Sequence, residues 1–227
     1  MKESSARARI STGSAHAAAR LAIAPRVLPD RERVRTYLVW AWWVGVAFFA
    51  VYPTMNWLTS RRPSPFHLYV SAELRLPFVP QFVWAYFSMY VLFVMPPFIL
   101  QKPQMSALGK QLIAGTLVSG LLFLLLPAEL GFERTIPTDA PYAGIYAAMF
   151  GVDRPYNLVP SLHVIYSAVI ALACADSARP VARAALLGWL AVIAASTILV
   201  HQHHVLDVAA AFVIVFLIRR RYEVTYA

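Results

Sequence analysis

The 227-residue chain contains a single cysteine, Cys174, and few charged side chains. One thiol cannot form a disulfide within the chain, and Cys174 lies in an apolar run, so a disulfide-rich secreted scaffold is excluded. Charged residues make up 14% of the sequence, against about 25% in a typical soluble domain. Hydrophobic residues make up 59%, which is more than the interior of a soluble domain of this size can bury. Much of the surface must therefore face lipid, and neither a soluble enzyme nor a disordered protein fits this composition.

The first 35 residues differ from the rest because they are basic and lack the continuous apolar core of a signal peptide. They hold eight Lys or Arg residues against three acidic ones. Their Arg, Ala and Ser content also has a faint similarity to an organelle transit peptide. We interpret residues 1–35 as a disordered basic cytosolic tail and residues 36–227 as a membrane domain.

Six apolar segments follow the tail, and they cover residues 37–58, 82–100, 112–126, 161–175, 184–200 and 205–218. We interpret them as helices because the chain lacks strands of about ten residues with alternating polarity. The first two are long enough to cross a bilayer unaided, whereas the later ones need flanking residues to do so. Pro53 and the pair Pro96-Pro97 should kink or end their helices. The sequence thus predicts an all-α polytopic membrane protein, a bundle of six transmembrane helices.

Lys and Arg residues lie mostly on one side of this predicted bundle. With the N-terminus in the cytoplasm, fifteen of them lie on the cytoplasmic side and five on the outer side, as the positive-inside rule requires. The net charge of +9 is therefore a topology signal, and no nucleic-acid partner is expected. We expect a multi-pass protein of the bacterial inner (plasma) membrane with both termini in the cytoplasm. Two long outer loops, 59–81 and 127–160, have the composition of an interfacial segment and of a functional loop respectively.

Ionisable residues near a bilayer core are costly and mark function, and here they gather at 160–163 and 201–207. Between His163 and His203 the chain crosses the membrane twice, so both histidines must lie on one side, the outer one. Residues His203 and Asp207 are four apart and share a helix face, so the carboxylate can hold one ring nitrogen while the other reacts. The neighbouring His204, three residues from Asp207, is an alternative partner by spacing alone.

Phosphate binding is predicted at the start of the fourth segment, where Ser161 follows an irregular loop and Asn157 is a candidate N-cap. A helix start offers unpaired N–H groups and a positive dipole, which suit a phosphate. Arg134 lies on the same outer side, and its guanidinium can bind phosphate oxygens in a bidentate way. Arg154 is the other cation in this loop, and it either takes that place or pairs with Asp153.

These motifs resemble those of a known family. The sequences PSLH at 160–163 and HHVLD at 203–207 are similar to the second and third signatures of the type 2 phosphatidic acid phosphatase superfamily. Residues 153–164 look closer still to its phosphotransferase-like branch, which includes inositol phosphorylceramide and sphingomyelin synthases. The similarity covers residues 37–221. It departs where Ser196-Thr197 replaces the family's Ser-Arg, and where Arg134 is the nearest match to the family's first motif.

The resemblance implies that His203 is a nucleophile oriented by Asp207, that His163 protonates the leaving oxygen, and that Ser161 binds phosphate. We therefore expect a lipid-phosphate phosphohydrolase, acting on phosphatidic acid, a prenyl pyrophosphate or a similar lipid through a phosphohistidine on the outer membrane face. No cofactor and no metal is expected, because the nucleophile is a side chain and the cations come from the protein. The candidate phosphate ligands are Arg134, Ser161 and Asn157.

Two alternatives remain open at this point. The first is a lipid head-group phosphotransferase, in which an acceptor alcohol replaces water. The second is a non-catalytic protein, either a transporter or one that binds zinc or copper through His163, His201, His203 and His204.

Overall fold

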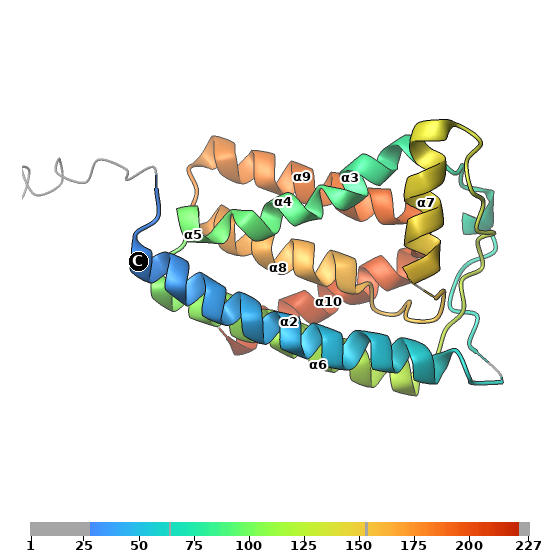
Figure 1. Ribbon diagram of the computed structural model, residues 1–227, viewed down its shortest axis with the longest axis horizontal. Coiled ribbons are helices and arrows are strands. Elements are labelled where there is room, and N and C mark those ends of the chain that lie inside the picture. Colours follow the sequence, from blue (N-terminus) through green and yellow to red (C-terminus); the bar gives the residue numbers. More distant parts are fainter. Residues whose placement is uncertain (1–27, 64, 153, 223–227) are drawn as a thin grey trace, which may run out of the picture. The chain divides into compact units, whose positions relative to one another are not determined.

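The computed structural model describes residues 28–63, 65–152 and 154–222. Its elements are α2 (Arg31–Thr59), the 3-10 helices η1 (Glu73–Arg75) and η2 (Pro80–Phe82), α3 (Val83–Phe87), α4 (Met89–Val94), α5 (Pro96–Ile99), α6 (Lys102–Leu125), α7 (Ala140–Val152), α8 (Leu162–Asp176), α9 (Pro180–Leu199) and α10 (Val205–Arg221) (Figure 1). The described residues contain no strand, only an isolated bridge between Phe66 and Ala128. The predicted all-α class is confirmed.

All these helices belong to one compact unit, Arg31–Ala227. The predicted tail over residues 1–35 falls mostly outside the described residues. Its last five residues, 31–35, differ from the prediction because they already form the start of α2.

Three helices, α2, α6 and α9, are long and apolar enough to cross a membrane. The helices α8 and α10 have 15 and 17 residues. At about 1.5 Å per residue each is shorter than the ~30 Å hydrocarbon core of a bilayer. The structure thus describes a helical protein with three candidate spans.

The predicted segment 82–100 is broken into η2, α3, α4 and α5 instead of forming one helix. At the first break, Ser88 Oγ donates a hydrogen bond to the carbonyl of Ala85 (2.6 Å) and competes with the backbone ladder. At the second break, Pro97 has no N–H for the carbonyl of Phe93. The hydroxyl of Tyr37 in α2 donates to that carbonyl instead (2.6 Å). Pro53, by contrast, does not end α2, which continues to Thr59.

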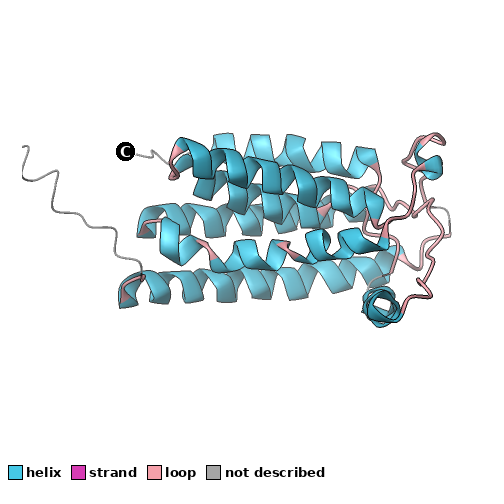
Figure 2. Ribbon diagram, turned by 90° about the horizontal axis from the view of Figure 1, so that it is seen from above, coloured by secondary structure: helices cyan, strands magenta, loops and turns pink. Residues whose placement is uncertain are grey.

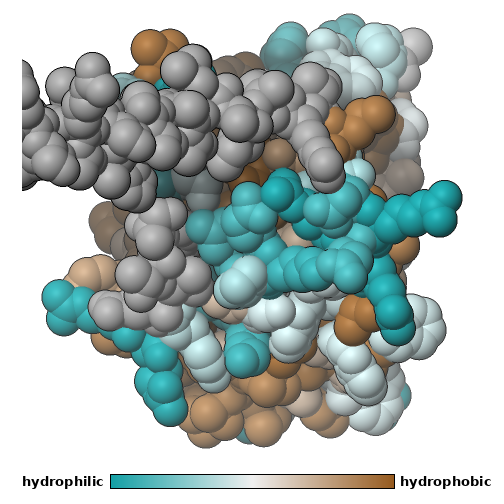
Figure 3. Space-filling model, turned by 90° about the vertical axis from the view of Figure 1, so that its left-hand side faces the viewer, coloured by the Kyte–Doolittle hydropathy of each residue, from teal (hydrophilic) through white to brown (hydrophobic). Residues whose placement is uncertain are grey.

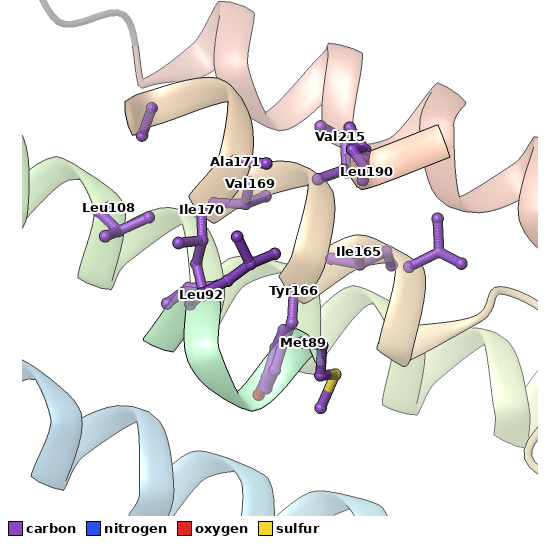
Figure 4. Close-up of a cluster of buried hydrophobic side chains, with 14 of the residues drawn as sticks. Met89, Leu92, Leu108, Ile165, Tyr166, Val169, Ile170, Ala171, Leu190 and Val215 are labelled. Atoms are coloured by element: carbon purple, nitrogen blue, oxygen red, sulfur yellow. The ribbon is translucent and has the colours of Figure 1, made fainter. Parts of the chain in front are cut away.

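Helix α8 forms the centre of the core, and twelve of its fifteen residues are buried. It packs against α4, α6, α9 and α10. Figure 4 shows Leu92 of α4, Leu108 of α6, Leu190 of α9 and Val215 of α10 gathered around it. Because α8 is packed against four other helices, its first turn has a fixed position at one end of the bundle.

The long helices α2 and α6 lie side by side (Figures 1 and 2). Glycines of α6 make this close approach possible. A Cβ atom at Gly109 would lie 2.3 Å from the ring of Trp40, and one at Gly120 would lie 2.3 Å from Val51. Small residues at a helix interface are typical of membrane bundles.

The two ends of the bundle differ. The connections 60–82 and 126–161 gather at one end, where α7 lies across the other helices (Figures 1 and 2). Hydrophilic side chains gather at the opposite end (Figure 3), where Asp176 pairs with Arg219 and Arg183 and Glu32 pairs with Lys102. Helix α7 lies inside the loop predicted over 127–160. Its thirteen residues are apolar but too few to be recognised as a span.

Candidate active site

The carboxylate of Asp207 connects two consecutive histidines at the start of α10. Its Oδ2 lies 3.1 Å from Nδ1 of His203 and accepts a hydrogen bond from the backbone N–H of His204 at 2.8 Å. Asp207 is buried, with 1% of its surface exposed. By spacing alone either imidazole could pair with this carboxylate, and in the structure it is His203 that does so. The bond orients the ring and leaves Nε2 as the reactive nitrogen.

His204 uses both ring nitrogens to hold the fold. Its Nδ1 lies 3.2 Å from Oε2 of Glu73, and its Nε2 accepts the backbone N–H of Gly131 at 3.1 Å. These partners assign a neutral ring with its proton on Nδ1. The ring is stacked between Tyr69 (4.6 Å between centroids) and Phe132 (4.5 Å). Burial lowers the pKa of His204, and the nearby Asp207 and Glu73 oppose that shift.

Glu73 is a site residue that sequence analysis missed. Its buried carboxylate accepts the N–H of Val205 (2.9 Å) at the start of α10 and the N–H of Val70 (3.2 Å) in its own loop. The positive end of the helix dipole also stabilises a carboxylate at this position. One signal was available, because Glu73 is the only acidic residue between positions 59 and 81.

His201 ends α9 in an unusual backbone conformation, with φ at +54°. Its N–H bonds the carbonyl of Ile198 (2.9 Å), and the N–H of Gln202 bonds that of Thr197 (3.0 Å). These two bonds define a Schellman motif, which is usually completed by glycine. The His201 ring is stacked on Phe132 at 4.0 Å. The reversal joins the end of α9 at Leu199 to the start of α10 at Val205, and His203 is buried within this turn.

His163 lies in the first turn of α8, and its ring is stacked on Tyr86 of α3 (3.8 Å between centroids). Its Nε2 lies 2.9 Å from the carbonyl of Tyr86. Because a carbonyl can only accept, the proton is on Nε2, and Nδ1 is the nitrogen that can exchange a proton.

The structure brings His163 and His203 to one cavity, as the parity of the predicted spans requires. The cavity has a volume of about 90 Å³ and is lined also by Asn157, Tyr52 and Tyr86. Among the described residues, none of those that line it is Lys or Arg. The starts of α8 and α10 lie side by side. The first turn of α8 lines the cavity through Leu162 and His163, so the positive end of its dipole lies there, whereas the start of α10 is occupied by the carboxylates of Glu73 and Asp207. The N–H of Ser161 donates to the carbonyl of Asp207 at 3.1 Å.

The predicted phosphate ligands Asn157 and Ser161 take other roles in the fold. Ser161, not Asn157, is the N-cap of α8, since its Oγ accepts the N–H of Val164 at 3.3 Å. Asn157 connects the loop to α2, where its side chain donates to the carbonyl of Tyr52 (3.0 Å) and accepts from Thr59 (3.2 Å). Of the two, only Asn157 lines the cavity.

The two candidate cations lie away from this cavity lining. The guanidinium of Arg134 lies 4.9 Å from the ring centroid of Phe150 in α7. Arg154 donates to Ser60 at the end of α2 (2.7 Å), and its carbonyl accepts from Asn56 (2.9 Å). The alternative pairing of Arg154 with Asp153 lies outside the described residues.

The metal-binding alternative has no geometric support in the part of the chain that the structure describes, where no three His, Cys, Asp or Glu side chains are placed to hold an ion. His204 has no lone pair left for a metal because Gly131 occupies Nε2 and the proton occupies Nδ1. Comparison of the chain with protein-family models, with curated proteins and with solved structures finds no match.

Proposed function

We propose that this protein is a multi-pass membrane phosphohydrolase that removes phosphate from a lipid through a phosphohistidine on His203. The observation that carries the proposal is the shared cavity of His163 and His203, with Nδ1 of His203 on the buried carboxylate of Asp207. A histidine held in this way is a competent nucleophile, and the second imidazole is within the same small space to move a proton. The similarity of residues 160–163 and 203–207 to the phosphatidic acid phosphatase signatures supports the same reading.

In the proposed first step, Nε2 of His203 bonds to phosphorus while the bond from phosphorus to the lipid oxygen breaks. Asp207 stabilises the positive charge that develops on the imidazole. Nδ1 of His163 takes up a proton when the anionic phosphate binds beside it, and gives this proton to the leaving oxygen. The backbone N–H groups of the first turn of α8 and its dipole stabilise the charge on the phosphoryl oxygens.

In the second step, neutral His163 takes a proton from water as the water oxygen attacks the phosphohistidine. Inorganic phosphate leaves together with that proton, and neutral His203 and His163 are restored for the next cycle. An acceptor alcohol can replace water here, which would make the enzyme a head-group phosphotransferase. The similarity of residues 153–164 to the phosphotransferase-like branch favours this second candidate.

The proposed topology has six spans, formed by α2, the broken segment from η2 to α5, α6, α8, α9 and α10. Both termini lie in the cytoplasm of a bacterial inner membrane, and the cavity opens on the outer side. Support comes from basic residues at the end of the bundle opposite the site, among them Lys102, Arg183 and Arg219.

The test is a substrate panel on the purified full-length protein. Phosphatidic acid, a prenyl pyrophosphate and a phosphodiester lipid are each supplied with and without inositol or a lipid alcohol, and the products are separated by thin-layer chromatography. Free phosphate that requires His203 supports the phosphohydrolase, and a new phosphorylated alcohol supports the transferase. Absence of both products from all substrates, with the folded protein in hand, would refute the proposed function.

A further inference from the structure

A second and larger cavity, of about 320 Å³, lies between α2, α4, α6 and α8. It shares Phe48, Met89 and Tyr166 with the cavity of His163 and His203. Met89 and Tyr166 are seen next to one another beneath α8 in Figure 4. The two cavities therefore adjoin one another at these three side chains.

Four ring side chains that carry a polar group line the larger cavity, and three of them, Tyr37, Trp40 and Tyr166, use that group within the protein. The hydroxyl of Tyr37 donates to Phe93 O, the indole N–H of Trp40 donates to Ser106 Oγ, and the Tyr166 hydroxyl is bonded to Thr116. The fourth is Tyr90, an exposed residue, and the other lining residues have no polar side-chain group. Such a surface favours hydrocarbon, because a polar occupant would lose its hydrogen bonds on leaving water.

The cavity is elongated along α2. Its lining runs from Tyr37 to Phe49, which at about 1.5 Å per residue corresponds to roughly 18 Å along the helix axis. Gly45 lies within this stretch, and a Cβ atom placed there meets no atom within 4 Å. The absence of a side chain at Gly45 therefore leaves open space on this wall.

We propose that this cavity, the chain groove, holds one hydrocarbon chain of the lipid whose phosphate lies between His163 and His203. The inference rests on the proposed function and narrows it to lipids with at least one long chain. The junction at Phe48, Met89 and Tyr166 is where the chain joins the head group. Chain length is then a determinant of affinity, because each buried methylene contributes about a fourfold factor.

Gly45→Leu tests the groove, because leucine fills the open wall without meeting another protein atom at Cβ. Gly188→Leu in α9 is the matched control, because Gly188 is likewise a helical glycine with no atom within 4 Å of a Cβ, and it does not line the groove. Equilibrium binding of radiolabelled hexadecyl phosphate and hexyl phosphate is measured on full-length protein carrying His203→Ala, so that turnover does not interfere. Thermal unfolding of each variant checks the fold, and Gly45→Ala provides a milder change.

We expect Gly45→Leu to weaken binding of hexadecyl phosphate at least tenfold, Gly45→Ala to weaken it less, and Gly188→Leu to leave it unchanged. Binding of hexyl phosphate should be the same in all variants. If Gly45→Leu left the affinity for hexadecyl phosphate unchanged, or lowered the affinity for both probes equally, the proposal that the groove binds the hydrocarbon chain would be refuted. Turnover is then measured with His203 present, and its absence despite the expected binding pattern would refute the phosphohydrolase and not the groove.

Discussion

Glu73 and His204 are 131 residues apart in the chain, and their side chains meet at 3.2 Å between Oε2 and Nδ1. The same carboxylate oxygen accepts the N–H of Val205, so it caps α10 and fixes the imidazole that follows His203. A loop that contains no long helix is thereby fastened to the residue next to the proposed nucleophile. The position of His203 depends on this contact even though Glu73 does not line the cavity.

Glu73→Ala should destabilise the protein, because it leaves the N–H groups of Val70 and Val205 and the ring of His204 without their acceptor. The loss of such buried bonds costs at least about 2 kcal/mol, which for a chain of this size is roughly 4–8 °C in Tm. Thermal unfolding in detergent measures it. Glu129→Ala removes a carboxylate from an exposed pair with His67 and serves as the control, with an expected effect below about 0.5 kcal/mol. Equal effects of the two variants would show that Glu73 is not a structural anchor.

His203→Ala should abolish turnover, by more than about a thousandfold, because it removes the proposed nucleophile. It should also abolish any acid-labile phosphoenzyme trapped with labelled lipid phosphate. His204→Ala should lower stability and activity together while a phosphoenzyme still forms. A phosphoenzyme that persists in His203→Ala and disappears in His204→Ala would reverse these two assignments.

Acidification should destabilise the protein in a window that His204 sets. Burial holds the folded-state pKa of His204 below its usual value of about 6.5, so between the two values the unfolded chain binds more protons than the folded one. Stability therefore falls as the pH falls below about 6.5 towards the folded-state pKa. The groups that face this ring are Glu73, Asp207 and His203. In a series of Tm values measured against pH, His204→Gln should have a lower Tm than the unchanged protein at neutral pH, and its Tm should fall less on acidification. An identical fall in Tm would exclude His204 as the cause.

The proposed topology predicts opposite labelling at two exposed positions. In a Cys174→Ala background, cysteine at Thr138 should react with an impermeant thiol reagent added to intact cells. Cysteine at Ser177 should react only after permeabilisation. Thr138 lies in the connection at the site end of the bundle, and Ser177 lies between α8 and α9 at the opposite end. The reverse pattern would place the cavity on the cytoplasmic side.

Hydropathy could predict where most of the helices lie, because burial in lipid or in the core demands long apolar runs. It could not predict the break at Ser88, which depends on a local hydrogen bond to Ala85, or the helix α7, which is too short to span. The spacing of His203 and Asp207 predicted a contact that the structure contains. Asn157 illustrates the limit, because the choice between capping α8 and connecting to α2 depends on a helix about 100 residues away.

The turn at His201–His204, between α9 and α10, has a consequence for the order in which contacts form as the protein is made. The connection 60–82 leaves the ribosome long before α10, and its residue Phe66 can pair with Ala128 soon after α6 is complete. The rings of Tyr69 and Phe132, however, stack on His204, and Phe132 stacks on His201 as well. Those contacts must wait for the last helical hairpin to insert. During biosynthesis the two connections therefore come together around His204 last, and a nascent chain that stops before His201 leaves the rings of Tyr69 and Phe132 without the imidazoles on which they stack in the finished protein.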